Sequence, residues 1–383
     1  MKLKLRHVLM AGTAALAFSG QAYADGHTKV IQSKSKASVA ISGQIQRAFF
    51  YVDDGSSNRV RHGEHGQSES GIDIKGSSAV NKDVKASFHI DMDVDTQQQN
   101  PDGTVNGGFG GEASGDINTP KVYAALAHSS MGKVAIGRNS AAADGVAHTQ
   151  LHGAYGFSAA LMLANIGDIQ LRNTTDQSLS GNNIDTRFST ALSDPGGRSP
   201  MIRYDTPRVG GFAAAISHED AGHVSFGANY GGSVGPFKVS VKTGYHNGDG
   251  DANDVAGVGS AIMHSSGLGG GFNYTLTMDG VEDTTVNQST ANSDIDVHQW
   301  YANVFYKSKF SEMGATTLIG EWQQSRDFGA SGAEGNAFGI GIGQNIDAAA
   351  VSLYMKYIHV DVDETGQSYE DVQAVESGIR MKF

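Results

Sequence analysis

Apolar and polar residues alternate along most of this chain, in segments of roughly ten residues separated by turns. Residues 84–94 place Val84, Phe88 and Ile90 on one face and Lys85 and Asp91 on the other. The same period of two recurs in residues 237–246 and 350–361. Because successive side chains of a β-strand point to opposite sides, this period predicts strands with one apolar and one polar face. We count sixteen such segments.

The connections between the predicted strands alternate between short turns and long polar loops. A soluble β-sandwich and a membrane β-barrel share the alternating pattern, but the barrel turns its apolar face outward. An even strand number with short turns at one end and longer loops at the other is typical of the barrel. We therefore predict an all-β, antiparallel transmembrane barrel of 16 strands. The division of residues 255–278 into two strands is the least certain, and an error there would give fourteen strands or break the parity.

The two ends of the chain support export to a membrane. Lys2, Lys4 and Arg6 precede the apolar residues 8–18, and Ala22 and Ala24 flank an A-x-A cleavage site. This order predicts a signal peptide over residues 1–24, rather than a buried N-terminal helix, and a barrel domain over residues 25–383. The remaining chain lacks the 18 or more consecutive apolar residues of a membrane helix, which leaves a barrel as the membrane-spanning structure. The final predicted strand alternates apolar residues and ends on the terminal Phe, and it resembles the C-terminal signature of bacterial outer-membrane barrels.

Composition narrows the function. The chain has 51 Gly, 6 Pro and no Cys, so a disulfide framework is excluded. Without the leader, 25 basic residues stand against 40 acidic ones, a formal charge of −15, which argues against nucleic acid as a partner. No nucleotide-binding glycine motif or nucleophile motif stands out, and we predict no enzymatic activity and no cofactor.

Four stretches, together with the C-terminal strand, resemble the trimeric general porins of Gram-negative bacteria. They are residues 41–44, which lead into 51–55, then 72–77, 132–139 and 203–207 followed by 211–212. These stretches are spread over the whole mature chain, and their order and spacing match those of the family. The resemblance implies a homotrimer in the outer membrane, surrounded by lipid and lipopolysaccharide, that lets small hydrophilic solutes diffuse passively. It also implies a long third loop that folds into the barrel, for which residues 141–199 are the candidate.

The pore constriction is predicted from resemblance and strand parity. Arg138 matches the family's constriction arginine. Arg203, Lys75 and Gln44 occupy the alternate positions of their strands that would face the lumen. A transverse field is expected where such basic wall residues face acids on the inward loop.

The acidic side of the constriction is predicted on that loop. Asp144 and Asp168 are the first candidates, and Asp176 and Asp185 are weaker ones, although loop acids are usually solvated. The run 157–166 is rich in Ala, Leu and Met. It is predicted to be a short helix packed on the inner wall, or else a misread strand.

Two departures from the family bear on selectivity. Ser70 and Gly71 stand where members often carry an arginine, and the acidic Pro-Glu-Phe-Gly-Gly loop tip is absent. Fewer lumenal arginines would weaken a preference for anions. Together with the acidic charge balance, this gives the hypothesis of mild cation selectivity.

Three other features have open interpretations. The segment from Asp249 to Asp254 begins like a calcium loop, but its sixth and twelfth positions depart from the pattern, so an acidic surface loop is favoured over a weak calcium site. His62 and His65 could ligate a metal, although solvated histidines are the more common case. Arg47 has outward parity, which suggests a place in a trimer contact.

Rival functions stay open at this level. A substrate-specific channel for sugars or phosphate would need an aromatic track or a basic lining. An outer-membrane enzyme would need a fixed nucleophile and base. A secreted β-rich adhesin would need the apolar face to be buried.

Overall fold

The computed structural model describes ten segments of the chain, which are residues 29–32, 37–64, 70–94, 117–157, 162–188, 195–220, 222–248, 254–278, 295–328 and 331–383. The predicted signal peptide, most of loop 96–119 and residues 249–253 of the calcium-like segment lie outside these residues. Among the helices of the described residues, none has the length and apolar character to cross a membrane.

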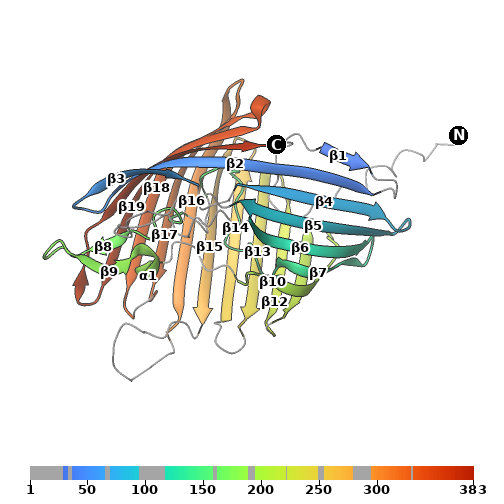
Figure 1. Ribbon diagram of the computed structural model, residues 1–383, viewed down its shortest axis with the longest axis horizontal. Coiled ribbons are helices and arrows are strands. Elements are labelled where there is room, and N and C mark those ends of the chain that lie inside the picture. The colour runs from blue at the N-terminus through green and yellow to red at the C-terminus, as the bar shows by residue number, and fades with distance from the viewer. Residues whose placement is uncertain are drawn as a thin grey trace.

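The regular elements are almost all strands (Figure 1). In chain order they are β1 (Lys29–Gln32), β2 (Ser38–Asp53), β3 (Asn58–Gly63), β4 (Gly71–Ala79), β5 (Val84–Val94), β6 (Ile117–His128), β7 (Gly132–Ser140), β8 (Gln170–Arg172), β9 (Leu179–Asn183), α1 (Ile184–Arg187), β10 (Arg198–Asp205), β11 (Phe212–Glu219), β12 (Val224–Val234), β13 (Phe237–Asn247), β14 (Asp254–His264), β15 (Leu268–Met278), β16 (Val297–Ser311), β17 (Gly314–Arg326), β18 (Glu334–Ile346), the 3₁₀ turn η2 (Asp347–Ala349), β19 (Val351–Glu364), β20 (Gln367–Ser368) and β21 (Val372–Lys382).

Sixteen strands form a closed antiparallel barrel, as the sequence predicts. They are β2, β4 to β7, β10 to β19 and β21, each paired with its neighbour along the chain. The ring closes because β21 pairs with β2, from Gln44 opposite Lys382 to Asp53 opposite Gln373. The terminal residue joins the closure, since the N–H groups of Gly43 and Phe383 each donate to the other's carbonyl. Every barrel strand thus has two partners, which removes exposed sheet edges.

The burial pattern is inverted relative to a soluble protein, and this separates the barrel from the sandwich. Phe49, Ile136 and Ile340 are more than half exposed, whereas Gln46 and Gln299 are fully buried. A large exposed apolar surface around buried polar side chains is the arrangement that a lipid environment requires. The secreted adhesin is excluded by the same observation.

The connections follow the predicted alternation. Residues 265–267 divide 255–278 into β14 and β15, so the least certain division is confirmed. Short turns join the strands at one end of the barrel, here called the turn end, and longer connections lie at the loop end. The exception is the short link between β11 and β12, where Gly222 N donates to Glu219 O.

Candidate functional site

The described residues between β7 and β10, which are 141–157, 162–188 and 195–197, form an inserted segment that runs along the inner wall of the barrel. Many of its apolar side chains face the wall, and Ala147, Leu163, Ile166 and Phe188 are fully buried. Several of them form one apolar cluster with Tyr301 of β16 and with inward residues of β18, β19 and β21. The segment is therefore the inward-folded third loop that the resemblance implies, and we call it the inner loop.

Four cations from four strands hold the inner loop by its backbone. Arg203 of β10 donates to the carbonyls of Ser140 and Ala141, both at 2.9 Å. The ammonium groups of three lysines continue the series, with Lys242 (β13) 2.8 Å from Gly145 O, Lys307 (β16) 2.9 Å from His152 O, and Lys356 (β19) 3.0 Å from Met162 O. The anchoring strands are three apart, so the loop is fixed at regular intervals as it passes around the wall. Charge-assisted bonds of this kind are among the stronger hydrogen bonds.

Inward-facing glycines let the loop approach the wall closely. A Cβ on Gly227 would lie 2.1 Å from Ala142 O, and one on Gly259 would lie 2.3 Å from Val146 O. A Cβ on Gly335 would lie 1.5 Å from the ring of Phe188. The abundant glycine of this chain thus serves loop packing at these places as well as turns.

The run 157–166 lies between these anchors, and its described part is a series of turns. Ile166 N donates to Leu163 O and Ile169 N donates to Ile166 O, both three residues back. Met162, Leu163 and Ile166 are buried in the apolar cluster, as the prediction of a wall-packed segment requires. Residues 158–161 lie outside the described part, and the described residues do not form the strand that was the alternative.

The β8–β9 hairpin extends the inner loop to the loop end of β2. Arg172 donates two hydrogen bonds to Asp54, from Nη2 at 2.7 Å and from Nε at 3.3 Å. Burial raises the pKa of Asp54, but the hydrogen bonds from Arg172 and from the N–H groups of Ser57 and Ser56 outweigh it, so that the pKa falls to about 2. This end of the loop is therefore tied by a charged pair at neutral pH.

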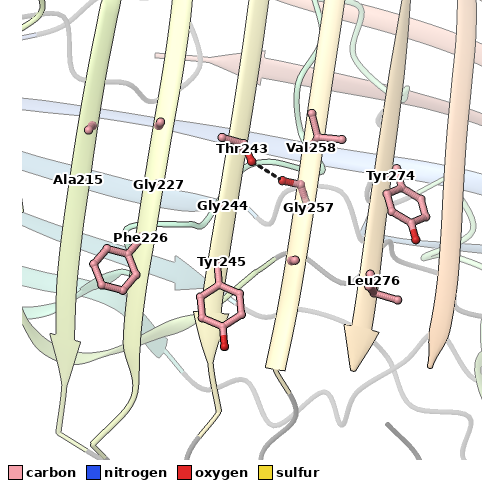
Figure 2. Close-up of a pocket in the computed structure, with 13 residues that line it drawn as sticks. Ala215, Phe226, Gly227, Thr243, Gly244, Tyr245, Gly257, Val258, Tyr274 and Leu276 are labelled. Carbon is pink, nitrogen blue, oxygen red and sulfur yellow. Dashed lines mark hydrogen bonds between the residues drawn. The ribbon is translucent and has the colours of Figure 1, made fainter. Parts of the chain in front are cut away.

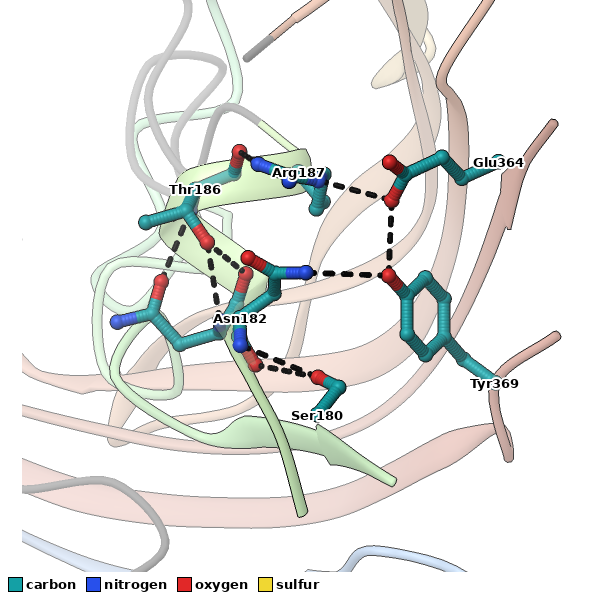
Figure 3. A network of polar contacts seen from close by, with 7 residues as sticks. Ser180, Asn182, Thr186, Arg187, Glu364 and Tyr369 are labelled. Atoms are coloured by element: carbon teal, nitrogen blue, oxygen red, sulfur yellow. Dashed lines mark hydrogen bonds and ion pairs between the residues drawn. The ribbon is translucent and has the colours of Figure 1, made fainter. Parts of the chain in front are cut away.

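A polar network ties α1 to the loop end of β19 (Figure 3). The turn begins at Asn183, whose side chain accepts from Thr186 N while the Thr186 hydroxyl accepts from Asn183 N, a reciprocal cap. Arg187 Nε lies 2.8 Å from Glu364 Oε2, which also accepts from the Tyr369 hydroxyl at 2.8 Å. The α1 turn is thereby held by residues at the end of β19 and in the connection to β21.

A fully buried ion cluster lies behind the middle of the inner loop. Lys356, 1 % exposed, lies 3.3 Å from Glu376 of β21 and 4.0 Å from Glu321 of β17. Tyr301 donates to Glu321 at 2.8 Å, and Asn165 of the inner loop donates to Glu376 at 3.3 Å. A buried charge of this kind is tolerated only when it is paired and hydrogen-bonded.

Of the three predicted basic residues of the constriction, two face the lumen and one faces outward. Arg203 and Lys75 face the lumen, and each is paired, Arg203 with Asp205 at 2.8 Å and Lys75 with Asp73 at 3.0 Å. Arg138 alternates with Val134 and Ile136 and is opposite Val122 and Pro200, all exposed on the outer face. The prediction that Arg138 lines the constriction is therefore wrong, because β7 turns Asn139, not Arg138, toward the lumen.

The predicted acids all lie on the inner loop. Asp144 interacts electrostatically with Lys121 of β6. Burial and the neighbouring Asp185 raise the pKa of Asp168, while Arg61 opposes that rise. Asp176 is exposed at the tip of the β8–β9 hairpin, where it accepts from Ser178. Asp144 and Asp168 thus belong to the loop but remain predictions as constriction acids.

Sequence reasoning missed the tyrosine that attaches the loop near its middle. Tyr155 donates to Gln46 of β2, and the guanidinium of Arg380 stacks over its ring at 4.3 Å. Next to it, burial and the nearby Lys307 lower the pKa of His152 to about 3, so this histidine is neutral. The sequence does carry a signal for such attachment points. Arg380 and Lys356 are charged residues that alternate onto the lumenal side of their strands, where they can hold a loop against the wall.

The lumenal face near the turn end is strongly basic. By strand register, nine cations share this face, namely Lys75, Lys85, Lys133, Arg203, Lys238, Lys242, Lys307, Arg380 and Lys382. Within the described residues, Asp73, Asp91 and Asp205 are the acids on the same face and level, and Lys121 lies directly opposite Asp91. The acidic balance of the whole chain therefore does not describe its lumen.

The outer face carries an apolar groove on β11 to β15 (Figure 2). Small residues such as Ala214, Ala228 and Ala256 line it together with the rings of Phe226 and Tyr274. Farther toward the loop end, Trp300 stacks with His298, and Arg326 lies over its ring at 5.7 Å. Aromatic side chains at this level fit an interfacial belt of a membrane barrel. Arg47 also has the predicted outward position and lies 3.4 Å from Glu64.

Together these features define a membrane-spanning barrel whose lumen is narrowed by a loop fixed to its wall. The sequence model of the Gram-negative porins matches residues 11–367, and the chain belongs to this family. It is thus an outer-membrane protein. A search of curated protein sequences gave no match.

Solved structures have the same fold at low sequence identity. An anion-selective porin from Comamonas acidovorans is 17% identical, with a TM-score of 0.59 over 91% of this chain and 100% of that one. The outer membrane channel DcaP of Acinetobacter baumannii is 12% identical, with a TM-score of 0.61 over 92% and 99%. OmpF of Salmonella typhi, in a complex with daunomycin, is 13% identical, with a TM-score of 0.56 over 93% and 100%.

Proposed function

We propose that this protein is a general diffusion channel, through which small hydrophilic solutes and ions pass passively. The observation that carries the proposal is the inner loop, fixed to the wall by Arg203, Lys242, Lys307 and Lys356. A loop fixed to the wall in this way narrows the water-filled barrel but leaves it open. The width and the wall charge of the narrowed pore then decide which solutes pass. Passage through such a pore makes and breaks no covalent bond, so we propose no enzymatic activity.

We further propose that the pore favours anions, which replaces the mild cation selectivity expected from the charge balance. The excess of the nine named cations over the three acids Asp73, Asp91 and Asp205 on the turn-end wall supports this selectivity. The comparison protein from Comamonas acidovorans is described as anion-selective, which is consistent with the proposal. A homotrimer is also proposed, in keeping with the trimer form described for OmpT of Vibrio cholerae.

Conductance of the purified mature protein in a planar lipid bilayer tests these proposals. We expect stepwise openings in groups of three, with conductance linear in salt, and a reversal potential in a KCl gradient that indicates anion preference. Saturation with one sugar or with phosphate would instead favour a substrate-specific channel. Absence of openings from folded protein would refute the diffusion channel, and cation preference would refute only the selectivity.

A further inference from the structure

Three side chains with metal-ligating atoms meet on the open wall of β4 and β5. Asp73, His89 and Asp91 each offer one ligand atom, and these atoms all lie within 4.8 Å of one another. Ligand bonds of about 2.0–2.2 Å to nitrogen and oxygen place neighbouring ligand atoms about 3–4 Å apart, so the three groups would share one ion once the hydrogen bond between His89 and Asp73 opens. We propose that this Asp-His-Asp cluster binds a divalent transition-metal ion of the zinc class at the lumenal wall.

The position of His89 is fixed by its surroundings. The side chain is only 9 % exposed, and its ring meets the ring of Tyr123 edge-on, with centroids 5.5 Å apart. Its Nε2 points at Asp73 Oδ1, 2.5 Å away. A buried imidazole held against a carboxylate brings a nitrogen and an oxygen donor to the same point, which is the mixed ligand set that zinc accepts.

The two carboxylates are placed where they repel each other. Asp73 and Asp91 are directly opposite across β4 and β5, a like-charge pair that destabilises a sheet unless a cation compensates it. Lys121, directly opposite Asp91 on β6, attracts its carboxylate, but among the described residues this carboxylate has no hydrogen bond and no ion pair within 4 Å. The strand also has a register shift between Asp91 and Asp93. Such irregularities re-aim side chains beside functional sites. A divalent ion would relieve the repulsion and engage the carboxylate of Asp91.

The chemistry of the cluster favours zinc-class ions over calcium or magnesium. Calcium takes six to eight oxygen ligands and magnesium prefers oxygen in octahedral geometry, whereas this site offers two carboxylates and an imidazole. Three protein ligands leave a fourth position open toward the lumen. Lys75 competes for the site, since its Nζ lies 3.0 Å from Asp73 Oδ1.

The experiment is a ZnCl2 titration of the metal-stripped, folded protein at neutral pH, followed by isothermal titration calorimetry and by reversal potential in a planar bilayer. We expect saturable binding of one ion per chain, and a shift of the reversal potential toward anions because two wall carboxylates are neutralised. Asp91→Asn and His89→Gln should both lose the saturable phase. Lys75→Met should bind Zn²⁺ more tightly, because it removes the competing cation.

The matched control is His246→Ala, which removes another lumenal histidine that lies 3.6 Å from the single carboxylate of Glu219. Its titration should equal that of the wild type, and CaCl2 should give no saturable signal with any variant. An unsaturable Zn²⁺ signal, or one unchanged in Asp91→Asn, would overturn the proposal and leave the cluster as an ion-pair network. If His89→Gln fails to fold, Asp91→Asn and Lys75→Met still decide the question.

Discussion

The lumenal faces of β16 to β21 and of β4 to β6 have the same alternating sequence pattern, yet they differ in what covers their polar side chains. On the first, the inner loop buries Lys356, Glu321 and Glu376 completely. On the second, Asp73, Lys75 and Asp91 remain partly exposed beside His89. A polar residue on the inward-facing side of a strand can therefore either anchor a loop or face the solute. The alternation of residues along the strand does not distinguish these two roles.

The largest expected effect follows from breaking the covered cluster. Lys356→Met would leave Glu321 and Glu376 buried without their cation, which should cost about 3–5 kcal/mol of stability. The midpoint of unfolding, followed as the heat-induced shift in electrophoretic mobility, should fall clearly. Lys309→Met removes an exposed lysine at the turn end and should change the midpoint little. Equal midpoints for the two variants would show that the cluster does not stabilise the barrel.

The close contact between loop and wall gives the next effect. Gly227→Val would drive a side chain into the backbone of Ala142, at a cost of about 1–3 kcal/mol or a displaced loop. Single-channel conductance and proteolysis of the inner loop should both increase. Gly231→Val is the control on the same face of β12, because the nearest atom to a Cβ there is the end of Arg208 at 3.8 Å. A similar change in both variants would contradict a specific role for the close approach.

The correction at β7 can be tested by comparing two arginines. Arg203→Gln would leave Asp205 with one cation fewer, so the reversal potential should shift toward cations. Arg138→Gln alters a residue on the outer face and should leave the reversal potential unchanged. Bilayer measurements in a KCl gradient check both. A larger shift for Arg138 than for Arg203 would restore Arg138 to the constriction.

The smallest effect concerns acid. Because the pKa of Asp54 is lowered to about 2, its pairing with Arg172 contributes stability that is fully present above the unfolded value of about 3.9 and is lost as the pH falls through about 2. Cleavage of the β8–β9 hairpin by an acid-active protease should therefore increase only below about pH 3. Asp54→Asn should be cleaved readily already at pH 4, whereas Asp176→Asn, at the exposed hairpin tip, should follow the wild-type profile. An unchanged profile for Asp54→Asn would show that another contact holds the hairpin.

The sequence by itself determined the strands, their number and the fold class. A period of two is a property of neighbouring residues, and short turns such as 265–267 interrupt it visibly, so β14 and β15 could be separated without coordinates. The same reasoning gave the lumenal side of Arg203 and Lys75, and it depends only on residues close together in the chain. The inner loop was instead expected from the resemblance to the porin family.

Only the tertiary structure decided which polar residues meet. Arg172 and Asp54 are 118 positions apart, and Lys356 reaches the carbonyl of Met162 across 194. The assignment of Arg138 rested on a family motif, but one step along a strand exchanges lumen for lipid, and pairing with Val122 and Pro200 settled its side. Closure of the barrel brings these distant residues into contact, and no local pattern records which strand a loop will lie against.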